Sequence, residues 1–270
     1  MTGLRLPKGP TRIVCLTEEP TEILYLLGEG ERVVGISAYT VRPPEARRDK
    51  PVVSAFIGGS IEKIAALQPD LIIGFSDIQA DLARDLIKAH LPVLIFNQRS
   101  LQEILEVVSQ VGRIVGRRAE ADVWVSRAIE RVERLGEKSA RRTERPKVYF
   151  EEWDEPMICG IHWVSELIEI AGGQDVFRDR SRQRGAKGRI VTAEQVAEAA
   201  PDIMLASWCG KPFEAEAVRS RAGMAGVPAV AQGRMIELPP EIILQPGPAC
   251  LTAGLDRLEQ VLAPGWQTRA

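Results

Sequence analysis

Two stretches of this chain, SIEKIAALQPDLII at residues 60–73 and TAEQVAEAAPDIML at residues 192–205, share one pattern. In each, a hydroxyl residue that can cap a helix precedes a first-turn glutamate, Glu62 or Glu194. Apolar positions at helical spacing follow, and Pro-Asp then ends the helix before an apolar strand. Each stretch therefore predicts one helix–turn–strand unit.

The separation of the two copies predicts two similar lobes. Glu194 follows Glu62 by 194 − 62 = 132 residues, whereas the repeats of solenoid proteins recur about every 20–50 residues. Elsewhere strand-like and helix-like segments alternate, which is typical of parallel sheets. We expect strands at 12–16, 32–36, 71–75, 93–96, 147–150, 203–206 and 234–238, and helices at 21–27, 61–67, 78–89, 163–171, 193–199 and 248–261. The expected fold class is α/β, with two Rossmann-like lobes and a ligand cleft between them.

The middle of the chain has a different pattern. Residues 100–142 contain no strand signal, and their apolar residues form two helical stripes separated by Gly116. The second helix is expected over 119–142, about 36 Å at roughly 1.5 Å per residue, long enough to join two lobes. The predicted domains are an N-terminal lobe at 1–98, a helical linker at 99–143 that contains this backbone helix, and a C-terminal lobe at 144–270.

Composition narrows the range of functions. The chain has 270 residues, 45% of them hydrophobic, and a formal net charge of −2, so it offers no electrostatic reason to bind nucleic acid. No run approaches the roughly 18 apolar residues of a membrane span. There is no GxSxG, P-loop or GxGxxG motif, and the only histidines are His90 and His162. We therefore expect no enzyme, no catalytic residue, no metal site and no cofactor.

The first eleven residues, MTGLRLPKGPT, lack the apolar core of a signal peptide. They predict a cytoplasmic protein if Met1 is the native start, and an exported one if an export signal was removed from this sequence.

Several segments together resemble one known family. They are RIVCLTEEPTEILYLLGEGERVVGIS (12–37), SIEKIAALQPDLIIGFSD (60–77), VYFEEWDEPMICG (148–160) and WVSELIEIAGGQDVF (163–177). In this order they resemble the substrate-binding proteins of ABC importers for vitamin B12, siderophores and haem, from about Arg12 to Leu262. Within that family the strongest likeness is to cobalamin-binding proteins of the BtuF type.

The resemblance implies a helical-hinge periplasmic binding protein. Such a protein is expected to be a monomer in the periplasm or cell envelope that holds a corrinoid between its lobes and delivers it to a permease dimer. The resemblance also implies that Glu62 and Glu194 dock onto arginines of the permease. A simpler interpretation remains open, because a first-turn glutamate gains about 0.3–1 kcal/mol from the helix dipole without any partner.

Ligand-contacting residues follow from the resemblance and from the shape of a corrinoid. A large, flat, mostly apolar macrocycle needs aromatic faces and a few polar anchors. The segment GISAYTVRPPEAR (35–47) resembles the one that carries a ligand-facing tyrosine in these proteins. Phe56 and Phe75 stand where such proteins often have Trp, Gln245 stands in place of a basic contact, and Gly188 and Arg189 replace a capping Trp. The predicted ligand-binding residues are Tyr39, Phe56, Phe75, Trp153, Glu241 and Gln245.

Two alternatives remain open. The segment FRDRSRQRGAKGR (177–189) is strongly basic; such a run is usually a solvated loop, but near a binding cleft it would favour an anionic ligand, such as a ferric siderophore or haem. The missing export signal favours a cytosolic corrinoid carrier without a transporter, whereas the paired glutamates argue against it.

Overall fold

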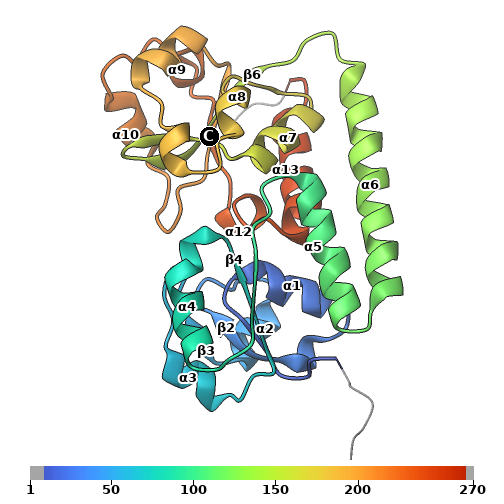
Figure 1. The fold of residues 1–270 in the computed structure, drawn as a ribbon. Helices are drawn as coiled ribbons and strands as arrows, with labels where there is room; N and C mark the ends of the chain where they lie inside the picture. Colours follow the sequence, from blue (N-terminus) through green and yellow to red (C-terminus); the bar gives the residue numbers. More distant parts are fainter. Residues whose placement is uncertain (1–8, 266–270) are drawn as a thin grey trace, which may run out of the picture. The chain divides into compact units, whose positions relative to one another are not determined.

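The computed structural model describes residues 9–265, which form two compact units (Figure 1). Unit 1 comprises the chain up to Gln98 together with Gln102–Ser126, and unit 2 comprises Arg99–Leu101 and the chain from Arg127 onward. Helix α6 (Arg118–Ala140) belongs to both, because the boundary falls between its residues 126 and 127. In the described part of the chain, no helix has both the length and the apolarity to cross a membrane.

Unit 1 is built on a five-stranded parallel sheet with the order β3-β2-β1-β4-β5, as in one half of a Rossmann fold. Its strands are β1 (Ile13–Cys15), β2 (Val33–Ser37), β3 (Val52–Ser54), β4 (Leu71–Phe75) and β5 (Val93–Phe96). Its helices are α1 (Glu18–Leu26), α2 (Pro44–Asp49), α3 (Ile61–Ala66), α4 (Ala80–Lys88) and α5 (Leu101–Ile114), with short 3₁₀ turns at Gly30–Arg32 and Asp77–Gln79.

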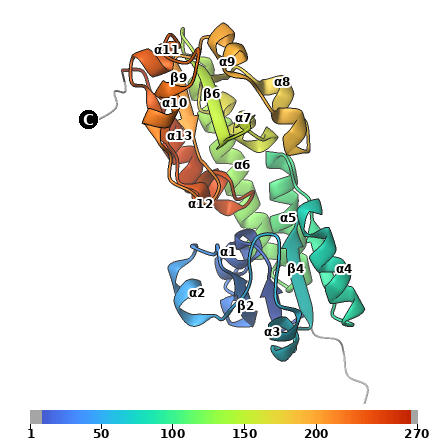
Figure 2. The same ribbon diagram turned by 90° about the vertical axis from the view of Figure 1, so that its left-hand side faces the viewer.

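The strands of unit 1 are buried on both faces. Ile13 and Cys15 pack in one apolar cluster with residues of α1, α5 and α6, whereas Val14 packs in another with residues of α3 and α4. This alternation is the two-residue period of a strand, and it explains why β1 reads as an unbroken apolar run. Helices α5 and α6 lie side by side (Figures 1 and 2), and a Cβ at Gly112 would lie 2.4 Å from that of Ala121.

Unit 2 contains a separate five-stranded sheet in which β10, β9, β6 and β7 are neighbours and β8 also pairs with β6. All pairings are parallel except the β6–β7 hairpin. The strands are β6 (Lys147–Asp154), β7 (Met157–Cys159), β8 (Gln174–Asp175), β9 (Ile203–Ala206) and β10 (Met235–Glu237). The helices are α7 (His162–Ile170), α8 (Arg178–Ser181), α9 (Ala193–Ala199), α10 (Ala215–Ser220), α11 (Pro228–Ala231), α12 (Pro240–Ile243) and α13 (Leu255–Val261), with a 3₁₀ turn at Ala186–Arg189 and a π-helical stretch at Cys250–Gly254.

The predicted α/β class with two separate sheets is confirmed, and every predicted strand is present. Strands β3, β7 and β8 were not predicted; each has at most three residues, and β8 consists of Gln174 and Asp175 alone, neither of which is apolar. The helix expected at 248–261 is present over those residues, and it contains the π-helical stretch at Cys250–Gly254. Packing places residues 102–126 in unit 1 and 127–143 in unit 2, and the domain boundaries at 98 and 144 stay a prediction.

The two copies of the repeat fold alike. Ser60 caps α3 by accepting a hydrogen bond from the backbone of Lys63, and Thr192 caps α9 through a reciprocal capping box with Gln195. After each helix one residue adopts a left-handed conformation, Gln68 or Ala200, each with φ of 48°. The chain then turns through a buried proline into the next strand.

The aspartate of each copy holds a neighbouring strand. Asp70 accepts hydrogen bonds from the backbone N–H groups of Thr11 (2.7 Å) and Arg12 (2.8 Å) and from the Thr11 hydroxyl (2.9 Å), just before β1. Asp202 accepts one from the backbone of Lys147 (2.8 Å), the first residue of β6. Each aspartate therefore ties its own strand, β4 or β9, to the strand beside it.

Replacing Asp70 by Ala is expected to lower the free energy of unfolding by about 1 kcal/mol, a small value because these hydrogen bonds are exposed to solvent. Burial raises the pKa of Asp70, but the hydrogen bonds from Thr11 and Arg12 outweigh it and lower the pKa below its usual value. The stabilisation should therefore be complete above about pH 4, the ordinary pKa of aspartate, and be lost as the pH falls through the lowered one.

Urea unfolding of wild type and Asp70→Ala between pH 3 and pH 7 measures this difference. The exposed Asp81→Ala variant in α4, which loses a surface pair with Arg84, is the control. A difference that is equal for both variants, or that grows on acidification, contradicts the assigned role of Asp70.

Candidate functional site

The carboxyl edge of the unit 1 sheet carries exposed apolar side chains. Because the strands are parallel, the loops that leave β2, β3 and β4 emerge at the same edge, where ligands bind in such sheets. We call the large apolar residues of these loops the apolar rim: Tyr39, Val41, Phe56, Ile57 and Ile78. Phe56 is half-buried, and the others are 47–67% exposed. Such a concentration of exposed apolar groups marks a binding surface.

The structure thus brings two predicted ligand-binding residues, Tyr39 and Phe56, to one edge. Tyr39 lies two residues after β2, and Phe56 lies two residues after β3, the strand beside β2. Phe75, the third predicted aromatic, is the last residue of β4 and is only 5% exposed. It lies at the same edge, but it does not present an open ring face as Tyr39 does.

A buried glutamine organises this edge of unit 1. The Oε1 atom of Gln79 accepts a hydrogen bond from the backbone of Phe75 (3.1 Å), and its Nε2 atom donates to the carbonyl oxygens of Phe56 (2.8 Å) and Leu16 (3.4 Å). Gly74 makes room for it, since a Cβ there would lie 2.4 Å from Oε1. The sequence prediction missed Gln79, although a glycine inside the apolar strand LIIGF signals such a close approach.

Carboxylates lie at the start of α1, next to the apolar rim. Glu18 and Glu19 are buried in the first turn of that helix, where the helix dipole favours negative charge. Glu18 accepts a hydrogen bond from the backbone of Val41 (2.8 Å), and Glu22 pairs with Arg42 (3.0 Å). These contacts fix the loop that carries Tyr39.

The carboxyl edge of the unit 2 sheet carries a second group of candidate residues. Trp153 is at the end of β6 and is half-buried, and Trp208 follows β9. Glu241 lies in the first turn of α12, which follows β10. Gln245 comes two residues after α12, and both Glu241 and Gln245 are half-buried. Trp208 was not predicted, because it follows an apolar strand and resembles a core residue.

Beneath this edge lies a fully buried carboxylate. Glu151 accepts two hydrogen bonds from Arg221 (2.6 and 2.9 Å), one from the Tyr149 hydroxyl (2.9 Å) and one from the Trp208 indole (3.0 Å). Burial, and then the charge of Glu151, raise the pKa of Tyr149 well above its ordinary value, so the hydroxyl stays protonated and donates. The Glu151 cluster, as we call these four residues, fixes Trp208.

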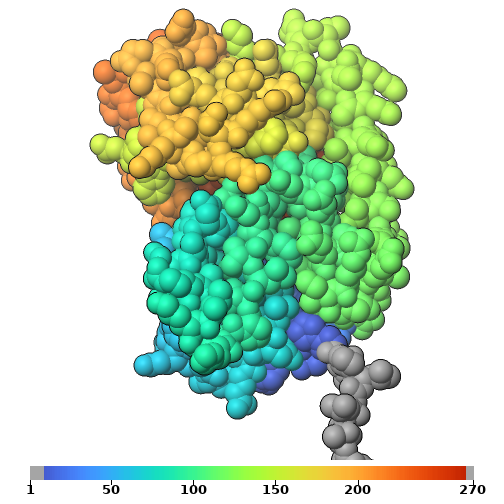
Figure 3. Space-filling view, in the orientation of Figure 1, coloured from blue at the N-terminus to red at the C-terminus, as the bar shows by residue number. Residues whose placement is uncertain are grey.

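Part of the arginine-rich segment has a structural role. Arg189 is 3% exposed, forms two hydrogen bonds with Glu152 (2.5 and 3.1 Å) and donates to the carbonyl of Cys159 (2.7 Å). Arg180 donates to the carbonyl of Ile190 (2.9 Å). The interpretation of the whole segment as a solvated loop is therefore wrong for Arg189. The segment belongs to the gold part of unit 2 in Figure 3. Its exposed cations include Arg182, Arg184 and Lys187.

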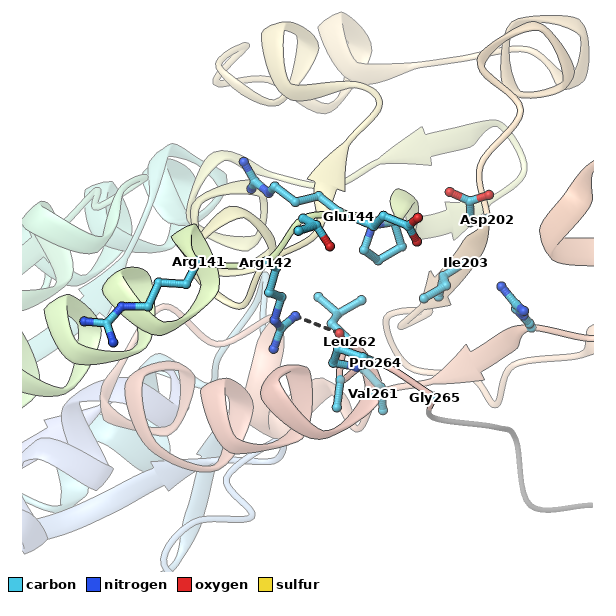
Figure 4. A pocket seen from close by; sticks show the side chains of 14 residues that line it. Arg141, Arg142, Glu144, Asp202, Ile203, Val261, Leu262, Pro264 and Gly265 are labelled. Carbon is cyan, nitrogen blue, oxygen red and sulfur yellow. Dashed lines mark hydrogen bonds between the residues drawn. The ribbon is translucent and has the colours of Figure 1, made fainter.

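A cavity of about 840 Å³ lies at the other edge of the unit 2 sheet (Figure 4). Its walls include the residues just before or at the starts of β6, β9 and β10, which is the amino edge. Arg142, in the wall, donates hydrogen bonds to the carbonyls of Leu262 (2.8 Å) and Ala171 (3.0 Å), so it joins the ends of α13 and α7. Ligands of parallel sheets bind at the opposite edge, so this cavity is not the candidate site.

The two glutamates of the repeat are exposed, as docking onto a partner requires. Glu62 is in the first turn of α3, and Glu194 is in the first turn of α9. A hydrogen bond from the Thr192 side chain and a backbone hydrogen bond lower the pKa of Glu194, so it is charged at neutral pH. Both side chains are available to a partner protein.

A family model and two known proteins are similar to this chain, and all three are named as binding proteins. The family model described as periplasmic binding protein matches residues 13–242. The ABC transporter substrate-binding lipoprotein YvrC of Bacillus subtilis is 25% identical over 269 residues, 96% of this chain and 82% of that protein. The vitamin B12-binding protein of Vibrio campbellii is 32% identical over 211 residues, 74% of this chain and 72% of that protein.

A solved structure has a fold similar to that of this chain. The crystal structure of a periplasmic haem-binding protein from Pseudomonas aeruginosa superposes with a TM-score of 0.81 and 19% identity, over 97% of this chain and 95% of that one. At this identity the likeness concerns the fold alone.

The Glu151 cluster generates a stability prediction. Replacing Arg221 by Met leaves the buried carboxylate without its cation, so the free energy of unfolding should fall by about 3–5 kcal/mol. Urea unfolding followed by tryptophan fluorescence measures this. The control is Arg219→Met in α10, the helix that Arg221 directly follows; it removes a surface pair with Glu216 (3.1 Å) and should change the value by less than about 1 kcal/mol. Equal losses in the two variants would show that Glu151 does not depend on Arg221.

Proposed function

Because this chain belongs to the periplasmic binding protein family, as a substrate-binding protein of ABC importers of the vitamin B12, haem and siderophore type, we propose that its ligand is a corrinoid. The family and the fold are those of binding proteins for transport rather than of enzymes. The interlobe cleft expected from the sequence is part of this proposal, with residues of both units contributing to ligand binding.

The observation that carries the proposal is the apolar rim of unit 1. A corrinoid presents a wide, largely apolar face, and burying apolar area is worth about 25 cal/mol per Å². Tyr39 and Phe56 offer aromatic surface, and Val41, Ile57 and Ile78 extend it with aliphatic groups on the same edge. In unit 2, Trp153 lies at the corresponding carboxyl edge. We propose Phe75, Glu241 and Gln245 as further contacts.

The charge of the unit 1 edge favours a corrinoid over an anionic ligand. Glu18 lies beside the rim, because its carboxyl group accepts a hydrogen bond from the backbone of Val41, and as an anion it would repel the propionates of haem or the carboxylates of a ferric siderophore. The amide periphery of a corrinoid carries no such charge. The second candidate, haem or a siderophore, is supported by the exposed Arg182 and Lys187 in unit 2.

We also propose that Glu62 and Glu194 dock the protein onto its permease. The capped helices α3 and α9 present one exposed glutamate from each unit, at equivalent positions of an equivalent fold. A permease made of two similar halves could use both through the same contact.

Titration with cobinamide or cobalamin should quench tryptophan fluorescence. Tyr39→Ala and Trp153→Ala should each weaken binding about tenfold, because a stacking contact is worth about 0.5–1.5 kcal/mol beyond its area. Two exposed isoleucines of unit 1, one inside the apolar rim and one outside it, give a matched pair of variants. Ile57→Ala at the carboxyl edge should weaken binding, whereas Ile87→Ala at the end of α4, with similar exposure (61% against 67%), should not.

Calorimetry with haem and with a ferric siderophore completes the test. Binding of either of these without corrinoid binding rejects the corrinoid proposal and favours the second candidate. In that case Arg182→Gln and Lys187→Gln should weaken binding, and added salt should do the same.

The double change Glu62→Ala/Glu194→Ala should leave folding and ligand affinity nearly unchanged, because both carboxylates are exposed. It should weaken association with the cognate permease and lower uptake, since charge pairs in an interface contribute several kcal/mol, about 2–5, when one partner is removed. The control is Glu45→Ala/Glu216→Ala, which removes exposed first-turn glutamates of α2 and α10. Normal permease binding and uptake by the Glu62/Glu194 variant would reject the docking role of these two glutamates.

A further inference from the structure

A lysine in the loop after β9 is held on three sides. The Nζ atom of Lys211 lies 4.7 Å from the ring centroid of Trp153 and 4.9 Å from that of Trp208. It also lies 2.7 Å from the carboxylate of Asp154. Two aromatic faces and a carboxylate all attract an ammonium group. Because the Lys211 side chain is still 40% exposed, the ammonium group remains accessible. We call these four residues the lysine seat.

The backbone builds this seat. The Lys211 N–H approaches the carbonyl of Trp208 (3.5 Å), and Gly210 between them has a φ of 81°. This is the geometry of a type II turn, which needs a positive φ at its third residue and therefore favours glycine there. The turn carries Lys211 back over the ring of the residue that begins it.

Both rings of the seat are fixed by their own hydrogen bonds. The Trp208 indole donates to Glu151, so that ring is anchored in the Glu151 cluster. The Trp153 indole donates to the carbonyl of Glu155 (2.8 Å) in the β6–β7 hairpin. The Lys211 ammonium therefore lies against two rings that are themselves held in place, at the carboxyl edge of the sheet.

The seat has no net charge, and this determines what it can bind. Asp154 neutralises Lys211, so a carboxylate that approaches the ammonium also meets the negative charge of Asp154. A carboxamide oxygen needs only a hydrogen-bond donor and carries no charge to be repelled. The ammonium has three N–H donors, and Asp154 does not use all of them.

We propose that Lys211 is a specificity-determining residue that donates a hydrogen bond to a neutral carboxamide at the periphery of the ligand, and that Asp154 makes the same position reject carboxylates. This inference rests on the proposed function and deepens it. It specifies a macrocycle fringed with amides rather than one fringed with acid groups.

The experiment uses two corrinoids with the same macrocycle, dicyanocobinamide with amide side chains and dicyanocobyrinic acid with carboxylic acid side chains. Wild type should prefer the amide form. Lys211→Met should weaken cobinamide binding about fivefold to tenfold. Asp154→Asn, which leaves the cation without its neutralising partner, should strengthen binding of cobyrinic acid about tenfold and change cobinamide affinity little. Each variant therefore changes the amide-to-acid ratio through a different ligand, Lys211→Met through cobinamide and Asp154→Asn through cobyrinic acid.

The surface pair Lys138–Glu259 provides matched controls, because it has the same 2.7 Å separation and lies on α6 and α13. Lys138→Met and Glu259→Gln should leave both affinities unchanged. If wild type binds cobinamide but Lys211→Met and Asp154→Asn keep its amide-to-acid ratio, the inference about the lysine seat is wrong and the corrinoid proposal stands. If wild type binds neither corrinoid, both are wrong.

Discussion

The buried carboxylate of Glu151 is the interaction on which the candidate site of unit 2 depends. Removing a carboxylate from water costs several kcal/mol, and only a complete set of donors offsets that cost. Arg221, Tyr149 and Trp208 supply the set, and each is held in turn by its contact with Glu151. The position of Trp208, and with it the seat of Lys211, follows from the need to satisfy one buried charge.

In unit 1 the corresponding buried polar side chain is the neutral amide of Gln79. Gln79 has one acceptor and two donor hydrogens, and it uses them to join the ends of β1 and β4 to the loop after β3. A buried amide needs no counter-charge, whereas the buried carboxylate of Glu151 does. In both units a polar side chain under the carboxyl edge holds aromatic residues there, Phe56 and Phe75 through Gln79 and Trp208 through Glu151.

The features that depend on residues close together in the sequence could be predicted from it. The strands predicted from runs of apolar residues are all present in the structure. The repeat of Glu62 and Glu194 predicted two equivalent helices with exposed glutamates, which the structure also contains. Tyr39 and Phe56 were predicted at the carboxyl edge, where they lie. Gln79 and Glu151 were missed because their partners are far along the chain, 63 residues away for Leu16 and 70 for Arg221. Lys211 was missed because its role depends on a turn and on two rings from different strands.

Helix α6 has a consequence for how the chain unfolds. Its first residues, Ala121 with Trp124 and Val125, pack in the apolar cluster of unit 1, whereas Arg131 and Lys138 pair with Asp256 and Glu259 of α13 in unit 2. A helix without tertiary contacts is only marginally stable in water. Melting of either unit therefore removes the support of half of α6 and weakens the remaining half, so the two units share one cooperative element although each has its own sheet and core.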